Sequence, residues 1–344
     1  MIKKVGIVIL NWNTRLLLQK FLPFLVKNTL SADTEIIIAD NASQDDSVEW
    51  VRLNFPELHV ISFDDNYGYA GGYNLALSGL KHEYFVLLNS DVEVTENWLG
   101  PLIDYMDSHS SCGALMPKIL DYTNRNKFEY AGASGGFIDR FGYPFCRGRI
   151  FEEIEQDYGQ YNSTSDIFWA SGACLMIRAK LYHELNGLDE KFFAHMEEID
   201  LCWRIKNRGY QIACVPGSVI YHVGGGTLSK NDSRKTYLNF RNNLILLYKN
   251  LPASSLNQVL FIRFWLDILA SLYFIISGKS KDGMAIFRAY RDFYAMKSKF
   301  KNTRNTHEEI KLNFLSGIYQ KSIVFDYYLR GKKKYSNLKG FNNN

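Results

Sequence analysis

The segment LLNSDVEV (87–94) carries the first residues that could do chemistry. An apolar run typical of a buried strand ends here in Asn89, Ser90 and Asp91. Magnesium and manganese prefer oxygen ligands and leave positions open for substrate phosphates, so one strand-end carboxylate can help to hold such an ion. An ordinary turn with a capping aspartate produces the same pattern, and this segment alone leaves both interpretations open.

A second group lies in FFAHMEEIDLCWR (192–204), where Glu197, Glu198 and Asp200 stand at the start of a predicted helix. The helix dipole favours acids at this position, which explains one of them better than three. Crowded carboxylates raise one another's pKa, and one of them then becomes a proton acceptor near neutral pH. We therefore expect a general base in this segment.

His222 in YHVGGGT (221–227) is the third candidate. It ends a predicted strand, and the glycines after it let the backbone approach a phosphate closely. A lone histidine is more often structural than functional. Its position beside a glycine loop that could order over a ligand favours a metal ligand.

Two further segments give weaker signals for nucleotide binding. In IADNASQDDS (37–46), Asp40 can accept hydrogen bonds from a base or a ribose, whereas Asp45 or Asp46 can simply cap the next helix. The glycine-rich NYGYAGGYN (66–74) matches neither the G-x-G-x-x-G nor the Walker pattern.

The elements that position these segments alternate between strand and helix. Apolar runs and helical periodicity predict strands over 5–10, 35–40, 59–63 and 84–91, and helices over 16–29, 45–55, 71–80 and 96–109. This order is typical of an α/β protein with a doubly wound, mostly parallel sheet, in which ligands bind at the carboxyl ends of the strands. The polar residues that follow these strands are Asn11, Asn13, Asp40, Asn41, Asp64, Asn66, Asn89 and Asp91.

The rest of the chain has a less regular pattern. We expect an irregular lobe over 118–168, a strand over 172–178, a helix over 197–209, and two short strands with a glycine loop over 210–227. From about Tyr237 the pattern is mainly helical. The sequence therefore predicts a catalytic domain over 1–233 and a basic helical region over 234–344.

Charge divides the chain at the same place. Residues 1–233 carry 20 Lys and Arg against 30 Asp and Glu, a net charge of −10, whereas residues 234–344 carry 20 against 6, a net of +14. A basic region of this kind indicates an anionic partner, either lipid head groups or nucleic acid. No nucleic-acid-binding module is recognisable, so we expect an anionic membrane surface and no nucleic acid.

The apolar stretch Leu256–Ser277 is nearly long enough to span a bilayer. Arg263 and Asp267 interrupt it, and charges at membrane depth are costly. A helix lying in the membrane interface is favoured over a spanning helix and over a helix packed on the protein or in a dimer. The oligomeric state stays open.

Cysteine use and the N-terminus bear on location. The five cysteines form no C-x-x-C pair, so a disulfide framework or a zinc site is not expected. The apolar run in MIKKVGIVILNWN is too short for a signal peptide. We expect a protein of the reducing cytoplasm, peripheral on the inner face of the cell membrane.

Taken together and in order, these segments resemble family 2 glycosyltransferases with a GT-A fold, over roughly residues 4–245. Within this family, the chain resembles the rhamnosyltransferase-like subgroup, which builds bacterial surface polysaccharides. The resemblance implies inverting transfer of a sugar from a nucleotide-diphosphate donor to a hydroxyl of a glycan or lipid-linked glycan, with Mg²⁺ or Mn²⁺. The segments that carry it are ILNWN, IADNAS, NYGYAGGYN, LLNSDV, SGACLMIR, FFAHMEEIDLCWR and YHVGGGT.

The resemblance also implies roles for single residues. Asp91 would hold the metal on the diphosphate with His222 as a further ligand, and Glu198, the second member of the acidic pair with Glu197, would be the catalytic base. The residues implied at the donor site are Asn11, Asn13, Asp40, Asn66, Asn74, Asn89, Ser90 and Asp91. Those implied at the reacting sugar and acceptor are Trp169, Gly172 and Ala173.

Two positions depart from the family pattern. Asn89 replaces the first acid of the Asp-x-Asp motif, which suits a deoxyribose donor such as dTDP-rhamnose, with a UDP-sugar as the alternative. Glu198 stands where Asp is commoner. Two other functions stay open: a nucleotidyltransferase acting on sugar phosphates, although ILNWNTR (9–15) lacks the glycine loop of that class, and an inactive glycan- or nucleotide-binding module.

Overall fold

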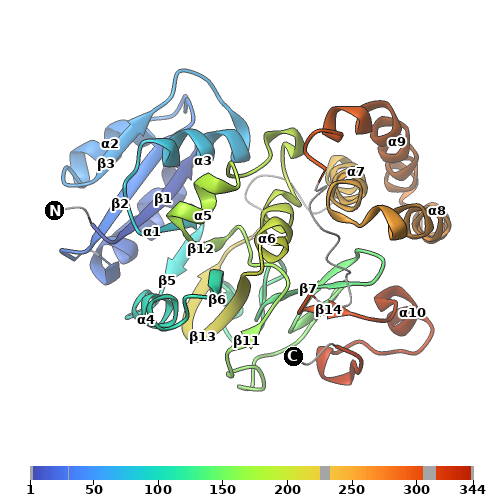
Figure 1. Ribbon diagram of the computed structural model, residues 1–344. Helices are drawn as coiled ribbons and strands as arrows, with labels where there is room; N and C mark the ends of the chain where they lie inside the picture. Colours follow the sequence, from blue (N-terminus) through green and yellow to red (C-terminus); the bar gives the residue numbers. More distant parts are fainter. Residues whose placement is uncertain (1–2, 30, 225–232, 305–314, 342–344) are drawn as a thin grey trace.

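A nine-stranded sheet forms the centre of the protein, seen in a computed structural model that describes residues 3–29, 31–224, 233–304 and 315–341 (Figure 1). The strand order is β11-β13-β6-β12-β4-β1-β2-β3, and β5 pairs with β13. The strands are β1 (Val5–Asn11), β2 (Thr34–Asp40), β3 (His59–Ser62), β4 (Tyr84–Leu88), β5 (Val92–Val94), β6 (Cys112–Asp121), β11 (Ser165–Asp166), β12 (Cys174–Arg178) and β13 (Gln211–His222).

The strands β4, β1, β2 and β3 are parallel neighbours, and the strands and helices of this part follow one another along the chain as predicted. Strands such as VGIVILN (β1) and YFVLL (β4) are almost wholly buried, as expected for a parallel sheet covered on both faces. The antiparallel strand β12 lies between β4 and β6. The α/β, mostly parallel fold is therefore confirmed. The accompanying helices are α1 (Arg15–Thr29), α2 (Ser47–Asn54), α3 (Gly68–Ser78), α4 (Gly100–Ser108), α5 (Ala179–Glu184) and α6 (Glu197–Asn207).

Two predictions for the middle of the chain were wrong. The expected irregular lobe contains four strands of a second sheet, because strands of two to four residues are too short to show a period. The expected pair of strands after 210 is one twelve-residue strand, β13, which pairs with β6 on both sides of an irregularity between Val215 and Val219. Pro216 and Gly217 at that irregularity look like a turn in the sequence. The second sheet contains β7 (Gly136–Asp139), β8 (Pro144–Cys146), β9 (Arg149–Ile150), β10 (Glu153–Ile154) and β14 (Ile318–Tyr319).

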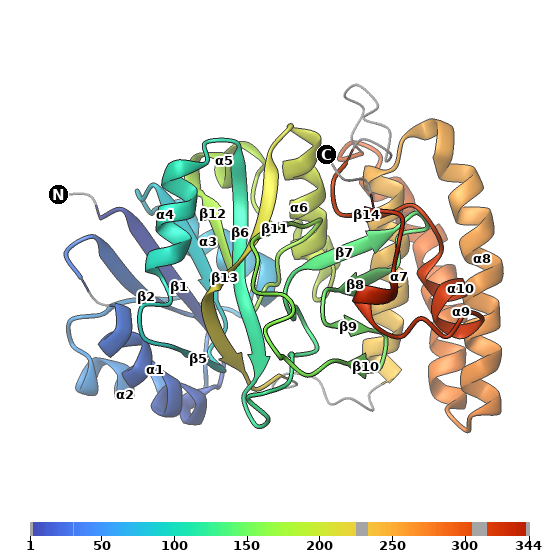
Figure 2. The same ribbon diagram turned by 90° about the horizontal axis from the view of Figure 1, so that it is seen from below.

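The C-terminal region is mainly helical, as predicted, and packs along the far side of the second sheet (Figure 2). The strand β14 pairs with β7, so this region completes a sheet that the first part of the chain begins. Leu244–Leu247 of the region belong to the same hydrophobic core as the central sheet. Its elements are α7 (Ser233–Asn250), α8 (Ala253–Ile276), α9 (Ser280–Met296), the 3-10 helix η2 (Lys297–Phe300), α10 (Ile323–Tyr328) and the 3-10 helix η4 (Tyr335–Asn337).

Candidate active site

Asp91 and His222 lie side by side at the end of the central sheet. The pairing of β13 with β5 sets His222 opposite Val92, and this register brings the Asp91 Oδ1 within 3.1 Å of His222 Nε2. The Val223 amide donates to the Asp91 carbonyl at 3.1 Å, which fixes the two strand ends together. Both side chains are buried.

Glu129 is a third member of this group that the sequence did not reveal. Its Oε1 lies 3.4 Å from His222 Nδ1, on the side of the ring opposite Asp91. Glu129 is buried and stands just after the isolated bridge between Phe128 and Leu120. It lies in the segment predicted to be irregular, where no motif marks it.

The charges of this group depend on one another. Burial opposes ionisation of Asp91, but the hydrogen bond and charge of His222 lower the pKa of its carboxyl below the ordinary value. Burial likewise opposes protonation of His222, yet its hydrogen bonds and charge interactions with Asp91 and Glu129 raise its pKa to about 10. His222 Nε2 and Asp91 Oδ1, 3.1 Å apart, are an imidazole nitrogen and a carboxylate oxygen, two ligand types that a divalent cation accepts once the histidine releases its proton. In the described part of the chain no set of three His, Cys, Asp or Glu is arranged to hold a metal, so phosphate oxygens would complete the coordination.

Asn11 and Asp40 meet at the ends of β1 and β2, where the parallel register pairs them. Asn11 Nδ2 donates to Asp40 Oδ1 at 2.7 Å, and the Ser43 amide donates to the other carboxylate oxygen at 3.1 Å. Asn11 therefore orients Asp40. Asn13 is exposed nearby in the left-handed region (φ 55°), and its side-chain oxygen accepts from the Gln44 amide at 2.7 Å.

The two asparagines that flank the glycine turn differ in their surroundings. Asn66 Oδ1 accepts from Asn41 Nδ2 at 2.8 Å and from the Gly68 amide at 2.9 Å, which shapes the entry to α3. Asn74 points away from this turn. It accepts from the Tyr182 hydroxyl at 2.7 Å and exchanges two hydrogen bonds with the Leu188 backbone, so the protein itself uses its amide. Its contact with a donor stays a prediction.

Glu197 and Glu198 begin α6; Glu197 is buried and Glu198 is half-buried. In each, Oε2 lies out of contact with solvent and has no hydrogen-bond partner among the described residues. Burial raises the pKa of both carboxyls, and the neighbouring charge of Glu198 raises that of Glu197 further.

Gly172 and Ala173 connect the acidic pair to the metal group. The Gly172 Cα faces α6, and a Cβ at this position would lie 4.0 Å from Glu198 Cβ and 2.7 Å from the Tyr69 hydroxyl. The Ala173 carbonyl accepts from the Asn89 amide at 3.0 Å, and Asn89 Nδ2 lies 3.5 Å from His222 Nε2. Neighbouring contacts thus run from His222 to Glu198 through one short stretch of backbone.

Tyr69 is another residue of this site that the sequence did not single out. Its hydroxyl donates to the Gly172 carbonyl at 2.9 Å. Burial, followed by the neighbouring Tyr73 and the two glutamates, raises its pKa, so it stays a neutral donor. In the sequence it stood inside the glycine-rich segment and looked like part of a loop.

Trp169 is placed differently from the two small residues that follow it. It is only 3% exposed, and its indole N–H donates to the Phe137 carbonyl at 3.0 Å. Its ring lies against Gly136, where a side chain would not fit. Trp169 therefore supports the wall behind Gly172, and a contact of its ring with an acceptor stays a prediction.

Helix α7 of the C-terminal region holds the turn before the acidic pair. Three residues of that turn, Phe193, His195 and Met196, have positive φ angles of 69°, 69° and 76°, a conformation that side chains other than glycine rarely adopt. The buried Asn242 Nδ2 lies within 2.9 Å of the carbonyl oxygens of 192, 194 and 195 and donates to them. The C-terminal region therefore helps to shape the site.

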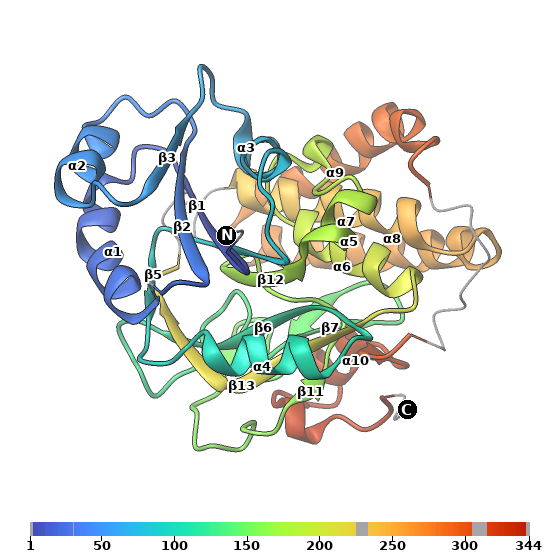
Figure 3. The same cartoon turned by 60° about the vertical axis from the view of Figure 1, so that its left-hand side comes forward.

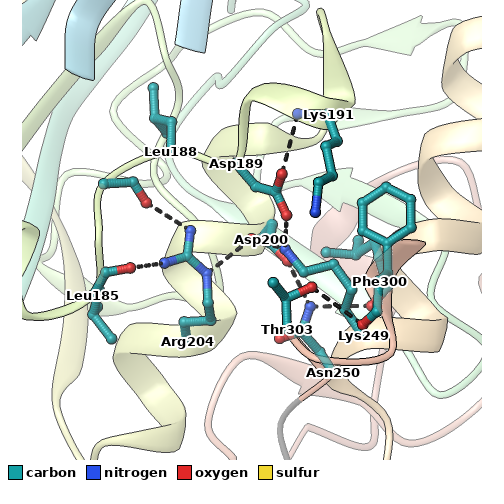
Figure 4. Close-up of polar contacts among 12 residues, drawn as sticks. Leu185, Leu188, Asp189, Lys191, Asp200, Arg204, Lys249, Asn250, Phe300 and Thr303 are labelled. Carbon is teal, nitrogen blue, oxygen red and sulfur yellow. Dashed lines mark hydrogen bonds and ion pairs between the residues drawn. The ribbon is translucent and has the colours of Figure 1, made fainter. Parts of the chain in front are cut away.

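Asp200, the third acid of the segment, is not grouped with Glu197 and Glu198. It belongs to a separate, buried ionic network (Figure 4). It accepts from Arg204 at 2.8 Å, from Lys249 at 2.9 Å and from Asn250 at 2.8 Å. Burial opposes its charge, but Lys249 and Arg204 lower its pKa below the ordinary value. Lys249 also reaches Asp189 at 2.6 Å, so the network ties α6 to α7.

Comparison with known proteins agrees with this geometry. The model of glycosyl transferase family 2 matches residues 6–185. The chain belongs to this family. Relatives within it include the low-salt glycan biosynthesis hexosyltransferase Agl10 of Haloferax volcanii, which is 24% identical over 63% of this chain and 68% of its own length. The N-acetylglucosaminyl-diphospho-decaprenol L-rhamnosyltransferase of Mycobacterium tuberculosis (24%; 58% and 70%) and the rhamnosyltransferase WbbL of Escherichia coli (24%; 59% and 79%) are also similar.

Solved structures identify the fold as GT-A. Staphylococcus aureus TarS 1–349 in complex with UDP-GlcNAc aligns with a TM-score of 0.56 at 15% identity, over 84% of this chain and 80% of that one. The mannosyltransferase PcManGT of Pyrobaculum calidifontis, in complex with GDP-Man and Mn²⁺, aligns with a TM-score of 0.53 at 13% identity, over 87% and 79%. The GT-A glycosyltransferase assignment expected from the ordered motifs is confirmed.

Proposed function

We propose that this glycosyltransferase is metal-dependent and inverting. It moves a sugar from a nucleotide-diphosphate donor, dTDP-rhamnose or a UDP-sugar, to a hydroxyl of a glycan or lipid-linked glycan in surface polysaccharide synthesis. The observation that carries this proposal is the closeness of the two groups: the Asp91–His222 pair adjoins Asn89 and Ala173, and Gly172, the neighbour of Ala173, lies beside Glu198.

The donor binds along the ends of β1, β2 and β4. Asp40, oriented by Asn11, accepts hydrogen bonds from the nucleobase, and Asn13 borders the same pocket. Asn89 and Ser90 lie toward the ribose and diphosphate, while Asn66 and Asn74 shape α3 beside it. Asp91 and His222 would hold Mg²⁺ or Mn²⁺, which when bound neutralises the leaving diphosphate as a Lewis acid.

Glu198 is the general base. It takes the proton from the acceptor hydroxyl, whose oxygen attacks the anomeric carbon opposite the diphosphate, so that the configuration inverts in one displacement. Burial raises the pKa of the Glu198 carboxyl, which favours its acceptance of a proton. Gly172 and Ala173 border the acceptor and the reacting sugar, and Trp169, earlier in the same segment, packs against Gly136.

The names of relatives support the proposed donor, and the charge of the C-terminal region supports the proposed location. Two of the curated relatives carry rhamnosyltransferase in their names, and the Mycobacterium tuberculosis relative is named for a decaprenol-linked acceptor. A lipid-linked acceptor, with the net charge of +14 on residues 234–344, supports a cytoplasmic enzyme held on the inner face of the cell membrane. No role for nucleic acid is proposed.

The test is a screen of dTDP-rhamnose, UDP-sugars and GDP-sugars, with and without Mn²⁺. It measures thermal shift first and slow donor hydrolysis second. We expect one donor to raise the melting temperature only with the metal and to be hydrolysed to a sugar of inverted anomeric configuration. Binding without hydrolysis or transfer would favour an inactive binding module, and release of pyrophosphate from a nucleoside triphosphate would favour a nucleotidyltransferase.

A further inference from the structure

The helix α8 is turned with its polar side chains inward and its apolar side chains outward. The residues of its buried stripe are Val259, Arg263, Asp267 and Ser271, one every four residues. Eight large apolar side chains on its other faces are exposed, from 39% for Phe264 to 85% for Ile276, and the remaining ones are half-buried. In water this is the reverse of the usual arrangement, in which the apolar stripe of a helix faces the core.

The buried stripe fixes α8 to the catalytic part of the molecule. Arg263 donates to the Phe141 carbonyl at 3.1 Å and to the side chain of Asn243, and it pairs with Asp267 at 3.3 Å. Asp267 in turn accepts from the Tyr143 hydroxyl at 2.6 Å. These contacts lie in the middle of the helix. By length and composition α8 could cross a membrane, but crossing would break its contacts with Phe141, Asn243 and Tyr143 and leave two charges at membrane depth.

The outward side chains form one surface with α10, here called the apolar face. Figures 1 and 2 show α8 at the outer edge of the molecule, with α10 beside it, and Figure 3 shows the two from a third side. The rings of Tyr273 and Tyr328 lie 6.2 Å apart and join the two helices. The exposed members of the apolar face are Phe261, Phe264, Trp265, Leu269, Leu272, Tyr273, Ile275, Ile276, Phe325, Tyr328 and Leu329.

The C-terminal region that carries the apolar face is predominantly basic, although Glu153 from the first part of the chain pairs with Lys333 beside α10. Four acids lie in the described residues after Asn250: two are buried, and the other two are partly buried and accept from hydroxyls of α7. Lys279 and Lys281 follow the last apolar residue of α8, and Arg330 lies over the Phe325 ring at 4.9 Å. The exposed basic residues there are Lys279, Lys281, Arg288, Arg291, Lys299, Lys301, Lys321, Arg330, Lys333, Lys334 and Lys339.

We propose that the apolar face inserts side-on into the head-group region of an anionic lipid bilayer, with α8 lying along the membrane and not through it. On such a surface the apolar side chains would contact the boundary of the acyl chains, and the basic side chains would contact the anionic head groups. A second copy of this chain would bring an equally basic rim to the contact, and like charges would oppose the pairing. This inference deepens the proposed membrane association and does not depend on the chemistry of transfer.

The test measures binding of the full chain to vesicles of phosphatidylcholine with a quarter phosphatidylglycerol at low salt. Fully burying an apolar side chain is worth roughly 1.5–3 kcal/mol, so we expect Leu269→Glu and Trp265→Glu each to weaken binding about tenfold or more. The matched control is Leu53→Glu, an exposed leucine of α2 in the acidic part of the chain, which should leave binding unchanged. Lipids brominated near the head group should quench Trp265 more than lipids brominated at the chain ends, with Trp265→Phe as background.

Three results would overturn the proposal. They are pelleting of wild type only with neutral vesicles or without any vesicles, binding of both apolar-face variants like wild type, and quenching that is greatest at the bilayer centre, as for a spanning helix. A dimer in lipid-free solution that both variants abolish would assign the face to a second copy. Donor hydrolysis in solution, without vesicles, is measured on every variant. It shows that the variants are folded and separates failure of the membrane surface from failure of the proposed transfer.

Discussion

Asn242 provides a sharp test of how the base is positioned. Asn242→Ala removes a side-chain amide that donates hydrogen bonds to the carbonyl oxygens of 192, 194 and 195. A buried hydrogen bond contributes about 0.5–1.5 kcal/mol, and an orphaned buried carbonyl costs about 1–3 kcal/mol, so the free energy of unfolding should fall by about 2–4 kcal/mol.

The larger effect should fall on turnover. The turn that Asn242 holds includes three non-glycine residues at positive φ, and each such residue stores about 1–3 kcal/mol of strain that the turn can release when the amide is lost. Relaxation of the turn would move Glu198, and a displacement of about 1 Å costs about 10²-fold in rate. We expect kcat to fall by about this factor while the KM for the donor changes about twofold at most, because the donor edge lies on β1, β2 and β4.

The assay is steady-state kinetics with thermal unfolding of the same samples. Asn243→Ala is the matched control: this neighbour is equally buried on α7, and its amide donates to the Gly142 carbonyl at 2.7 Å and accepts from Arg263, both away from the turn. The control should lose comparable stability and keep its kcat. Equal losses of kcat in the two variants, or full turnover in Asn242→Ala, would refute the positioning role.

The other predictions concern the site itself and its support. Glu198→Gln should abolish transfer and leave donor binding by calorimetry intact; near-normal turnover would remove Glu198 from the base role. Asp91→Ala should lose the metal-dependent part of donor binding, and an unchanged titration would contradict its role as a ligand. Gly172→Ala should reduce kcat at least about tenfold by forcing the Tyr69 hydroxyl away from its 2.7 Å approach to the new methyl, with an unaffected rate as the contrary result. The pKa of Asp200 is depressed in the folded state, so its contribution to stability is present above the ordinary carboxyl pKa and is lost as pH falls through the lower folded value. Asp200→Asn should therefore lower the melting temperature at neutral pH and flatten its acid dependence; parallel acid profiles for variant and wild type would contradict this.

The sequence was sufficient for the parallel half of the sheet and for its polar edge. Runs such as VGIVIL and EIIIAD are short and mainly apolar. A run of this length without helical periodicity indicates a strand that is buried on both faces of a sheet. Asp91, Glu198 and His222 were found because acids and a histidine at element ends stand out against such runs.

The residues that were missed act through contacts distant in the chain. Glu129 lies between β6 and the short strands of the second sheet, where the sequence shows no period, and its role becomes visible only when the fold brings His222 of β13 beside it. Asn242 lies in the middle of a helix, where an asparagine looks like part of a solvated face. Arg263 and Asp267 looked like interruptions of an apolar helix, although their pairing with Tyr143 is what turns that helix outward. The sequence around each of these residues does not show which distant residue it will contact.

The central claim is that Asp91, His222 and Glu198 share one site. The most direct measurement is anomalous scattering from crystals grown with Mn²⁺ and either dTDP or UDP. We predict one manganese peak in coordination contact with Asp91 Oδ1, His222 Nε2 and the diphosphate, with the Glu198 carboxylate facing the same space on the side where the sugar would lie. Manganese bound by other residues, or a nucleotide that leaves Glu198 on a separate surface, would contradict the account.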